Sequence, residues 1–289
     1  MKNDLRIWMA QAPILSRLVL INIGVFLVFS ILHLLSFLFA SPVGIDDVLT
    51  RYLVTFASPQ ALLRQPWGLI TYQFLHAGLW HLLGNMFMLY FSGVLFSSLL
   101  GETRMLRLYL FSGVFGALFF SLCYQLFPIF SGVRNEAFAL GASASVLGVM
   151  TAIAVYTPTY RVRLFGIWEI QLRYLALVLV LLDLVAIPDG NAGGHFAHLG
   201  GAGFGAWYAW RLKNGHEPLG WWMQMETFFK NIFSGKPKPN MRRPSKATSS
   251  KRTDQNEVDA ILDKISKSGY ESLSKSEKEV LFRASGKKP

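Results

Sequence analysis

The chain has 289 residues, of which 52% are hydrophobic and 16% are charged, whereas about 25% of residues are charged in a typical soluble domain. This composition excludes a disordered protein and a coiled coil, and the single cysteine, Cys123, excludes an intrachain disulfide and a cysteine-rich metal site. The formal net charge is +11, but 15 of the 28 Lys and Arg residues lie in the stretch 230–288. We therefore expect a membrane-embedded body with a basic tail, and no binding of nucleic acid.

Six apolar runs predict six membrane-spanning helices, because a bilayer can hide several separate segments of about 20 apolar residues. The runs are Leu15–Phe39, His81–Leu100, Leu106–Phe127, Gly141–Thr157, Leu172–Ile187 and Phe196–Leu212. The first is too long for the apolar part of a cleaved signal peptide, and no Ala-x-Ala site follows it. The sequence predicts an all-α membrane protein, with a six-helix bundle at 15–212 after a short N-terminal segment at 1–14.

The distribution of basic residues predicts the orientation of the bundle. With the N-terminus inside, the inner segments before the tail hold ten Lys and Arg residues and the outer loops hold three, which are Arg51, Arg64 and Arg134. We therefore expect a multi-pass protein of the cell (inner) membrane with both termini in the cytoplasm.

Two stretches outside the spans have the spacing of amphipathic helices. In the long first outer loop the apolar positions are Val48, Leu49, Tyr52, Leu53 and Phe56. At 213–234, Trp221, Trp222 and Met225 begin a second apolar stripe. We expect both helices to lie on the membrane surface.

The C-terminal tail divides into a basic linker at 235–253, expected to be disordered, and a small helical hairpin at 254–289. Ser274 and Glu277 have the spacing of a capping box at the start of the second hairpin helix. A hairpin of this size is too small to be stable alone, so we expect it to dock on a partner, which the sequence does not identify. A DNA-binding helix-turn-helix is a poor alternative because the first helix is acidic.

Polar side chains inside the predicted spans form three clusters, and each is a functional candidate because polar groups in a bilayer are costly. The clusters are His81-x-x-x-Asn85, Gly141-Ala-Ser143-Ala-Ser145 and His195-x-x-His198-x-x-Gly201-x-x-x-Gly205. Taken singly, each also has a packing interpretation: a polar pair that joins helices, a small-residue contact, or a buried histidine. The face that carries His198, Gly201 and Gly205 can pack closely on another helix.

The predicted topology brings these clusters together. Spans two, four and six run from the outside inward, so four polar side chains lie in their first turns at one depth: His81, Asn85, Ser143 and His198. A hydroxyl, an imidazole and two side-chain donors are the groups that acyl transfer needs. We expect Asp183 and Asp189 nearer the outer end, with no carboxylate at the level of His198, and therefore a Ser–His dyad.

Two serines compete for the role of nucleophile, and they point about 200° apart on a helix. Ser143 lies at the helix start, where backbone N–H groups are free. Ser145 continues a small-residue stripe with Gly141 and Gly148, so the sequence predicts Ser143 as the nucleophile.

The order and spacing of these motifs resemble the rhomboid family of intramembrane serine proteases, in a bacterial form with a cytoplasmic tail. The resemblance covers about Trp67 to Leu212. It rests on Trp67, His76, His81-x-x-x-Asn85, Gly101, Gly141-x-Ser143 and Ala197-His198-x-x-Gly201-x-x-x-Gly205.

The resemblance implies a serine endopeptidase with Ser143 as nucleophile and His198 as general base. His81, Asn85 and the Ser143 backbone N–H would hold the oxyanion beside Gly141, and His76 would have a structural role. We expect no cofactor and no metal, because the sequence has no His-Glu-x-x-His pattern of a metalloprotease. The expected partners are the lipid bilayer and single-pass transmembrane substrates with small or helix-breaking residues near the cut.

The chain departs from the family pattern at three positions, none of them in the dyad. Gly68 follows Trp67 where an arginine is common, Ser97 replaces a common glutamate, and Leu147 replaces an aromatic residue that stacks on the histidine. A catalytically inactive rhomboid-like protein that binds transmembrane clients is the alternative. A small transporter would show internal repeats, which we do not find.

Overall fold

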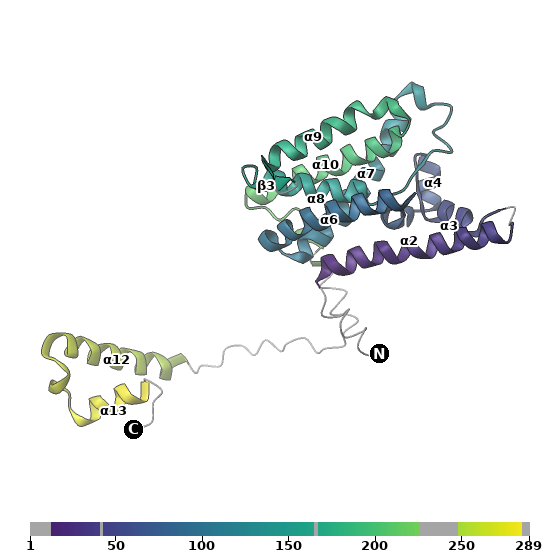
Figure 1. Cartoon of the computed structure of the whole chain (residues 1–289). Coiled ribbons are helices and arrows are strands. Elements are labelled where there is room, and N and C mark those ends of the chain that lie inside the picture. Colours follow the sequence, from purple (N-terminus) through teal and green to yellow (C-terminus); the bar gives the residue numbers. More distant parts are fainter. Residues whose placement is uncertain (1–12, 41–42, 165–166, 223, 226–247, 285–289) are drawn as a thin grey trace. The chain divides into compact units, whose positions relative to one another are not determined.

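The computed structural model describes the chain except for residues 1–12, 41–42, 165–166, 223, 226–247 and 285–289. The chain separates into two compact units, Met1–Met223 and Gln224–Pro289 (Figure 1). The helices of the first unit are α2 (Ile14–Leu38), α3 (Ile45–Leu53), α4 (Pro59–Arg64), α5 (Gly68–Thr71), α6 (Leu79–Leu100), α7 (Glu102–Leu126), α8 (Ser143–Tyr156), α9 (Leu172–Val185) and α10 (Ala192–Lys213), with the 3-10 turns η1 (Tyr72–Phe74), η2 (Pro128–Phe130) and η3 (Ile187–Asp189).

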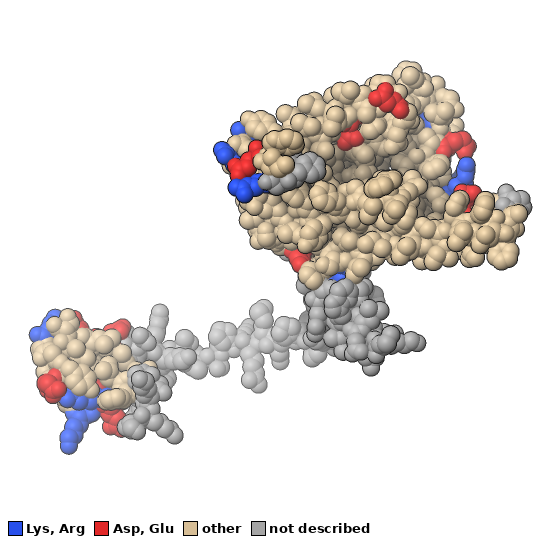
Figure 2. All heavy atoms as spheres, viewed as in Figure 1, with Lys and Arg blue, Asp and Glu red and all other residues tan. Residues whose placement is uncertain are grey.

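The helices α2, α6, α7, α8, α9 and α10 correspond to the six predicted spans, and the predicted all-α membrane bundle is confirmed. Within the described part of the chain, α2, α6 and α7 are long and apolar enough to cross a membrane. The helices α8 and α9 have 14 residues each and are shorter. Figure 2 shows few charged side chains over the body of this unit, as a bilayer requires.

Helix α8 lies at the centre of the bundle, and every residue from Ala144 to Ala154 is buried. It packs most extensively on α10. A Cβ atom added to Gly201 would collide with the Ala144 carbonyl, and one added to Gly205 would collide with the Gly148 carbonyl. The glycine face of α10 therefore packs directly on the backbone of α8, as the sequence predicts.

The first outer loop is only partly the predicted amphipathic helix. Helix α3 ends at Leu53, and Phe56 lies in the two-residue strand β1 (Thr55–Phe56). This strand pairs antiparallel with β2 (Phe138–Ala139), with Phe56 opposite Phe138 and their rings 6.4 Å apart. Placing Phe56 on the helix was therefore wrong, because a pairing with a distant segment extends the backbone there.

Close backbone packing accounts for Gly68. A Cβ at this position would collide with the carbonyl of Val54. The neighbouring Trp67 donates a hydrogen bond from Nε1 to the Tyr52 carbonyl at 2.8 Å, and Thr71 Oγ1 donates to the Leu53 carbonyl at 2.6 Å. These bonds hold α5 against the end of α3, and this packing leaves no room for a larger side chain at position 68.

Polar contacts join the start of α2, the start of α7 and the segment that follows α10. The backbone N–H of Ile14 donates to Glu102 Oε2 at 2.8 Å, and Arg104 Nε donates to Glu217 Oε2 at 2.8 Å. The starts of α2 and α7 and the segment after α10 therefore meet at one end of the bundle. The antiparallel hairpin of β3 (Arg161–Leu164) and β4 (Trp168–Gln171), which the sequence did not predict, joins α8 to α9.

The rings of Trp221 and Trp222 lie 6.0 and 5.4 Å from the ring of Phe111. Residues 223 and 226–234 of the predicted surface helix at 213–234 lie outside the described residues, and its place on the membrane surface stays a prediction.

The second unit contains α12 (Thr248–Ser268), η4 (Tyr270–Ser272) and α13 (Lys275–Ala284). Helix α12 begins inside the stretch expected to be linker, because good helix formers such as Lys251 and Arg252 extend it; residues 235–247 lie outside the description. The predicted capping box is formed: the Ser274 N–H donates to Glu277 Oε2 at 2.7 Å, and the Glu277 N–H donates to Ser274 Oγ at 3.3 Å.

We predict that Glu277→Gln loosens the hairpin. The Lys264 ammonium at 2.8 Å, helped by the Ser274 N–H, lowers the pKa of Glu277 to about 2. A carboxyl with a lowered pKa stabilises the fold above its unfolded value of 4.5 and loses that contribution as the pH falls toward 2. At pH 7 the amides of α13 should exchange hydrogen several-fold faster in the variant, and the difference should shrink near pH 2. Equal exchange in Glu277→Gln and the exposed control Glu257→Gln at pH 7 would contradict this role.

Candidate active site

Ser143 and His198 meet through their side chains, although they lie far apart in the sequence. The Ser143 Oγ atom is 2.6 Å from His198 Nε2, a short hydrogen bond. Ser143 begins α8, and the contact of Gly201 with the Ala144 backbone brings α10 close enough for a serine to reach the imidazole. The structure thus joins the two residues that the sequence paired.

A carboxylate also reaches His198, which corrects the sequence-based expectation. Asp183 Oδ1 lies 2.7 Å from His198 Nδ1 and 2.8 Å from His195 Nδ1. The helices α9 and α10 are antiparallel neighbours with a short connection. Asp183 is in the last turn of α9 and His195 is in the first turn of α10, so they share one level. The expectation that no carboxylate lies at the level of His198 is wrong.

The helix starts differ from the prediction in one respect that affects the site. Helix α10 begins at Ala192 rather than Phe196, because the Asn191 side chain caps it by accepting a hydrogen bond from the Gly194 N–H. His198 therefore lies in the second turn of α10, and Asn85 lies in the second turn of α6. Ser143 and His81 lie in the first turns of α8 and α6, as predicted.

His81 and Gly141 flank the serine. Gly141 has φ +132°, a conformation that favours glycine, and a Cβ there would lie 3.0 Å from His81 Nε2 and 3.3 Å from Ser143 Oγ. The absence of a side chain at 141 thus lets the His81 ring come close to Ser143. Asn85 Nδ2 donates to the His81 carbonyl at 2.8 Å, which leaves its second N–H for another acceptor.

The serine opens into a cavity of about 320 Å³. Its lining residues are Asn85, Met88, Ser143, Leu147, Leu179, Leu182, Asp183, Ala186, His195 and His198. The cavity brings together the serine, the three-residue Asp–His–His cluster and one of the predicted amide donors, on walls that are otherwise apolar. Leu147, which replaces the aromatic residue of the family pattern, is part of this wall.

Ser145 faces the other way, as the sequence predicts. Its side chain is fully buried, and its Oγ donates to Gln73 Oε1 at 3.1 Å. A Cβ added to Gly113 of α7 would meet this hydroxyl at 2.5 Å. Ser145 is therefore a packing residue between α8, α7 and η1.

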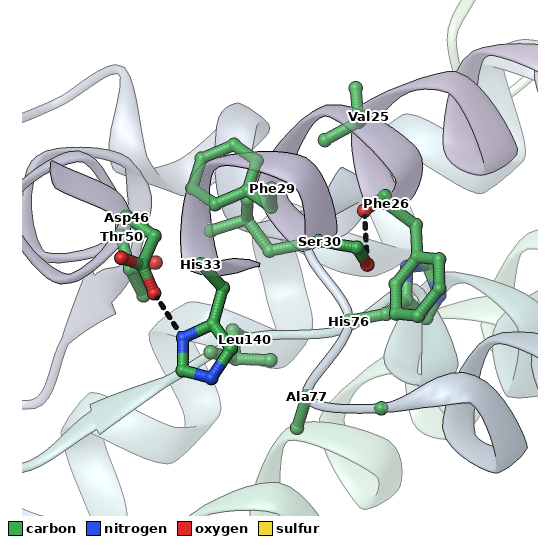
Figure 3. A pocket seen from close by; sticks show the side chains of 12 residues that line it. Val25, Phe26, Phe29, Ser30, His33, Asp46, Thr50, His76, Ala77 and Leu140 are labelled. Atoms are coloured by element: carbon green, nitrogen blue, oxygen red, sulfur yellow. Dashed lines mark hydrogen bonds and ion pairs between the residues drawn. The ribbon is translucent and has the colours of Figure 1, made fainter. Parts of the chain in front are cut away.

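A second cavity of about 360 Å³ lies between α2, α3 and the loop before α6 (Figure 3). At one end His33 Nδ1 lies 2.8 Å from Asp46 Oδ2, and His76 lines the opposite part. The ring of His76 packs edge-on against His81, 5.3 Å away. Burial, with His81 as a smaller cause, lowers the pKa of His76 to about 4, so it is neutral at pH 7. A neutral ring packed beside His81 fits the structural role expected for His76.

Among the described residues, Asp183, His195 and His198 form the one group of three side chains that could hold a metal ion, with ligand atoms within 4.8 Å of one another. The two hydrogen bonds to Asp183 Oδ1 already account for this arrangement.

Sequence reasoning missed Asp183 and His195 as members of the site. Two signals were present: a carboxylate within an apolar span, and the i, i+3 spacing of His195 and His198 on one helix face.

Comparison with known proteins gives two family matches. The Rhomboid domain matches residues 63–215, and a family of unknown function, DUF6576, matches residues 245–287. The chain is similar to Presenilin-associated rhomboid-like protein A, mitochondrial, of Danio rerio, with 30% identity over 65% of this chain and 49% of the relative. It is also similar to RHOMBOID-like protein 2 of Arabidopsis thaliana, with 32% identity over 47% of this chain and 39% of the relative.

A third relative, Rhomboid protein 1, mitochondrial, of Saccharomyces cerevisiae, is 31% identical over 50% of this chain and 41% of the relative. The aligned region thus covers less than half of each of these three proteins.

Proposed function

Because this chain belongs to the rhomboid family, we propose that it is an intramembrane serine endopeptidase that uses Ser143 as nucleophile and His198 as general base. The observation that carries the proposal is the 2.6 Å contact between Ser143 Oγ and His198 Nε2 at the wall of a cavity within an apolar bundle. A buried serine that only packs has no need of an imidazole base, and Ser145 is an example of such a serine in the same helix.

In the first half of the reaction, Ser143 Oγ attacks the carbonyl carbon of the scissile bond while its proton moves to His198 Nε2. The C=O electrons move to oxygen and give a tetrahedral oxyanion. When this intermediate collapses, the C–N bond breaks, His198 gives its proton to the leaving amine, and an acyl ester remains on Ser143. In the second half, water takes the place of the serine hydroxyl, and His198 again accepts and returns the proton.

The oxyanion needs hydrogen-bond donors that are in place before the reaction. The first N–H groups of α8 have no partner within the helix, and Ser143 supplies one of them. His81 and the second N–H of Asn85 are the other two candidates around the serine. Removing one such donor costs roughly 3–4 kcal/mol of transition-state stabilisation in well-studied hydrolases.

The proposed substrates are single-pass transmembrane proteins with small or helix-breaking residues near the cut, because the scissile bond must become extended to reach Ser143. The proposed site of action is the cell (inner) membrane. The relatives from Danio rerio and Saccharomyces cerevisiae are named as mitochondrial proteins.

The test is direct. The purified protein is reconstituted in vesicles with a model single-pass substrate that carries small residues near one membrane boundary, and the products are identified by mass. Two fragments that together account for the substrate plus one water support the proposal. An intact substrate under conditions in which the protein is folded would favour an inactive protein that binds transmembrane clients.

We also propose that both termini are cytoplasmic. In support, three arginines lie at the end of the bundle opposite the β1–β2 pair: Arg104 at the start of α7, and Arg161 and Arg163 in β3 after α8. Basic residues are expected to stay on the inner side of the membrane. In a Cys123→Ala background, Gly132→Cys should react with an impermeant thiol reagent from outside and Thr159→Cys should not. Both positions are exposed in the structure, so the reverse pattern would contradict this orientation.

A further inference from the structure

Asp183 is a carboxylate that the Ser–His dyad does not include, and two imidazole rings contact one of its oxygen atoms. Its Oδ1 lies 2.7 Å from His198 Nδ1 and 2.8 Å from His195 Nδ1. The side chains are shielded from solvent, with exposed fractions of 14% for Asp183, 21% for His198 and 19% for His195. A carboxylate in an apolar helix is costly, so its retention needs a reason.

We propose that Asp183 is a positioning residue that holds His198 in the form able to accept the Ser143 proton, and that His195 fixes the Asp183 carboxylate for this task. The proposal rests on the proposed function. It extends the predicted dyad to an Asp183–His198–Ser143 triad, in which His195 holds the Asp183 carboxylate.

The argument begins with the proton on His198. An ionised carboxylate only accepts hydrogen bonds, so a neutral His198 bonded to Asp183 carries its proton on Nδ1. The lone pair is then on Nε2, the atom that faces Ser143 Oγ at 2.6 Å. This is the tautomer in which the imidazole can take the hydroxyl proton, and the opposite tautomer would present an N–H to the serine and block the transfer.

The same contact acts when the proton has moved. His198 then carries a positive charge, and its Nδ1–H donates to Asp183 Oδ1, 2.7 Å away. The cavity wall beside these groups includes Leu147, Leu179 and Leu182. An apolar surrounding strengthens the attraction between the imidazolium and the carboxylate, so the charged intermediate is stabilised more than the resting enzyme.

His195 explains why the carboxylate stays in place. Its ring lies 5.9 Å from the His198 ring at an angle of 85°, so the two imidazoles approach Asp183 Oδ1 from different directions. Two crossed donors restrict rotation of the carboxylate. Among the described residues, His195 is the ring that packs against His198, and Leu147 supplies no ring. Asp183 and His195 thus hold the ring of the base in place.

The test compares kcat and KM of Asp183→Asn with those of Asp189→Asn, in folded full-length protein with a model transmembrane substrate. Asp189 is an exposed carboxylate in η3, between α9 and α10, so its variant controls for the loss of a negative charge. An asparagine can donate to Nδ1 and favour the wrong tautomer, so kcat of Asp183→Asn should fall roughly 10²- to 10⁴-fold with KM within about twofold. The kcat of Asp183→Glu should be at least tenfold higher than that of Asp183→Asn. The kcat of Asp189→Asn should match wild type.

A kcat for folded Asp183→Asn within threefold of wild type would overturn the proposal. If that variant does not fold, His195→Gln decides: a drop in kcat of about tenfold at unchanged KM supports the proposal, and an unchanged kcat overturns it. A chelator should leave the wild-type rate unchanged; loss with a chelator and recovery with Zn²⁺ would make the cluster a metal site and overturn the positioning role. Ser143→Ala is assayed alongside, and if it cleaves as well as wild type, the proposed function fails rather than this inference alone.

Discussion

Replacing Ser143 with alanine is expected to lower turnover of a transmembrane substrate by about 10³-fold or more, because it removes the proposed nucleophile. His198→Ala should have an effect of similar size. The double variant should be little worse than either single variant, since the two side chains act as one unit at a 2.6 Å contact. The measurement is the initial rate of product formation at saturating substrate in vesicles.

Ser145→Ala is the matched control, because it removes a serine hydroxyl from the same helix two positions after Ser143. Ser145 Oγ donates to Gln73 and lies away from the cavity, so its loss should cost about 1 kcal/mol of stability and leave turnover within about threefold of wild type. Loss of activity in Ser145→Ala with retention in Ser143→Ala would reverse the assignment.

Gly201→Leu is expected to destroy the site without touching a reacting group. A Cβ at this position collides with the Ala144 carbonyl, which belongs to the residue next to Ser143. The leucine must push α10 from α8 and thereby separate His198 from Ser143. Overpacking of a well-packed core commonly costs about 1–3 kcal/mol, and a collision with backbone lies at the upper end or beyond. We expect turnover to fall by about 10²-fold or more and the thermal midpoint in detergent to fall as well.

Gly203→Leu provides the control for this variant. Gly203 is exposed on the same helix, and a Cβ there meets nothing within 4 Å. Its leucine should leave both turnover and thermal midpoint near wild type. If Gly201→Leu behaves like Gly203→Leu, the close contact of α8 and α10 is not what positions the dyad.

The sequence contained enough information to place the helices and to pair Ser143 with His198. These features depend on residues that are close together in the sequence, so local patterns reveal them. They are the long apolar runs, the i, i+3, i+7 spacing of His198, Gly201 and Gly205, and the capping box at Ser274. The separation of Ser143 from Ser145 likewise follows from helix geometry alone.

The contact of Asp183 with His198 depended on helix ends, which local patterns place poorly. The apolar run predicted a start at Phe196, and the two adjacent glycines before it discourage helix in isolation. In the structure Asn191 caps the helix, and Gly193 packs where a Cβ would lie 2.9 Å from the Phe120 ring. Because of these tertiary contacts α10 starts at Ala192, and Asp183 in the last turn of α9 lies level with His195 and His198 of α10. The β1–β2 pair failed to be predicted for a similar reason, because its two short strands are distant in sequence.

The central claim is that Ser143 is a nucleophile activated by His198, and covalent labelling measures it most directly. The full-length protein in detergent is treated with a serine-directed fluorophosphonate, digested, and mapped by mass. We predict a single modified serine at Ser143 in wild type and in Ser145→Ala, and no modification in His198→Ala, because the hydroxyl then lacks its base. Modification of Ser145 in place of Ser143, or equal labelling of wild type and His198→Ala, would contradict the account.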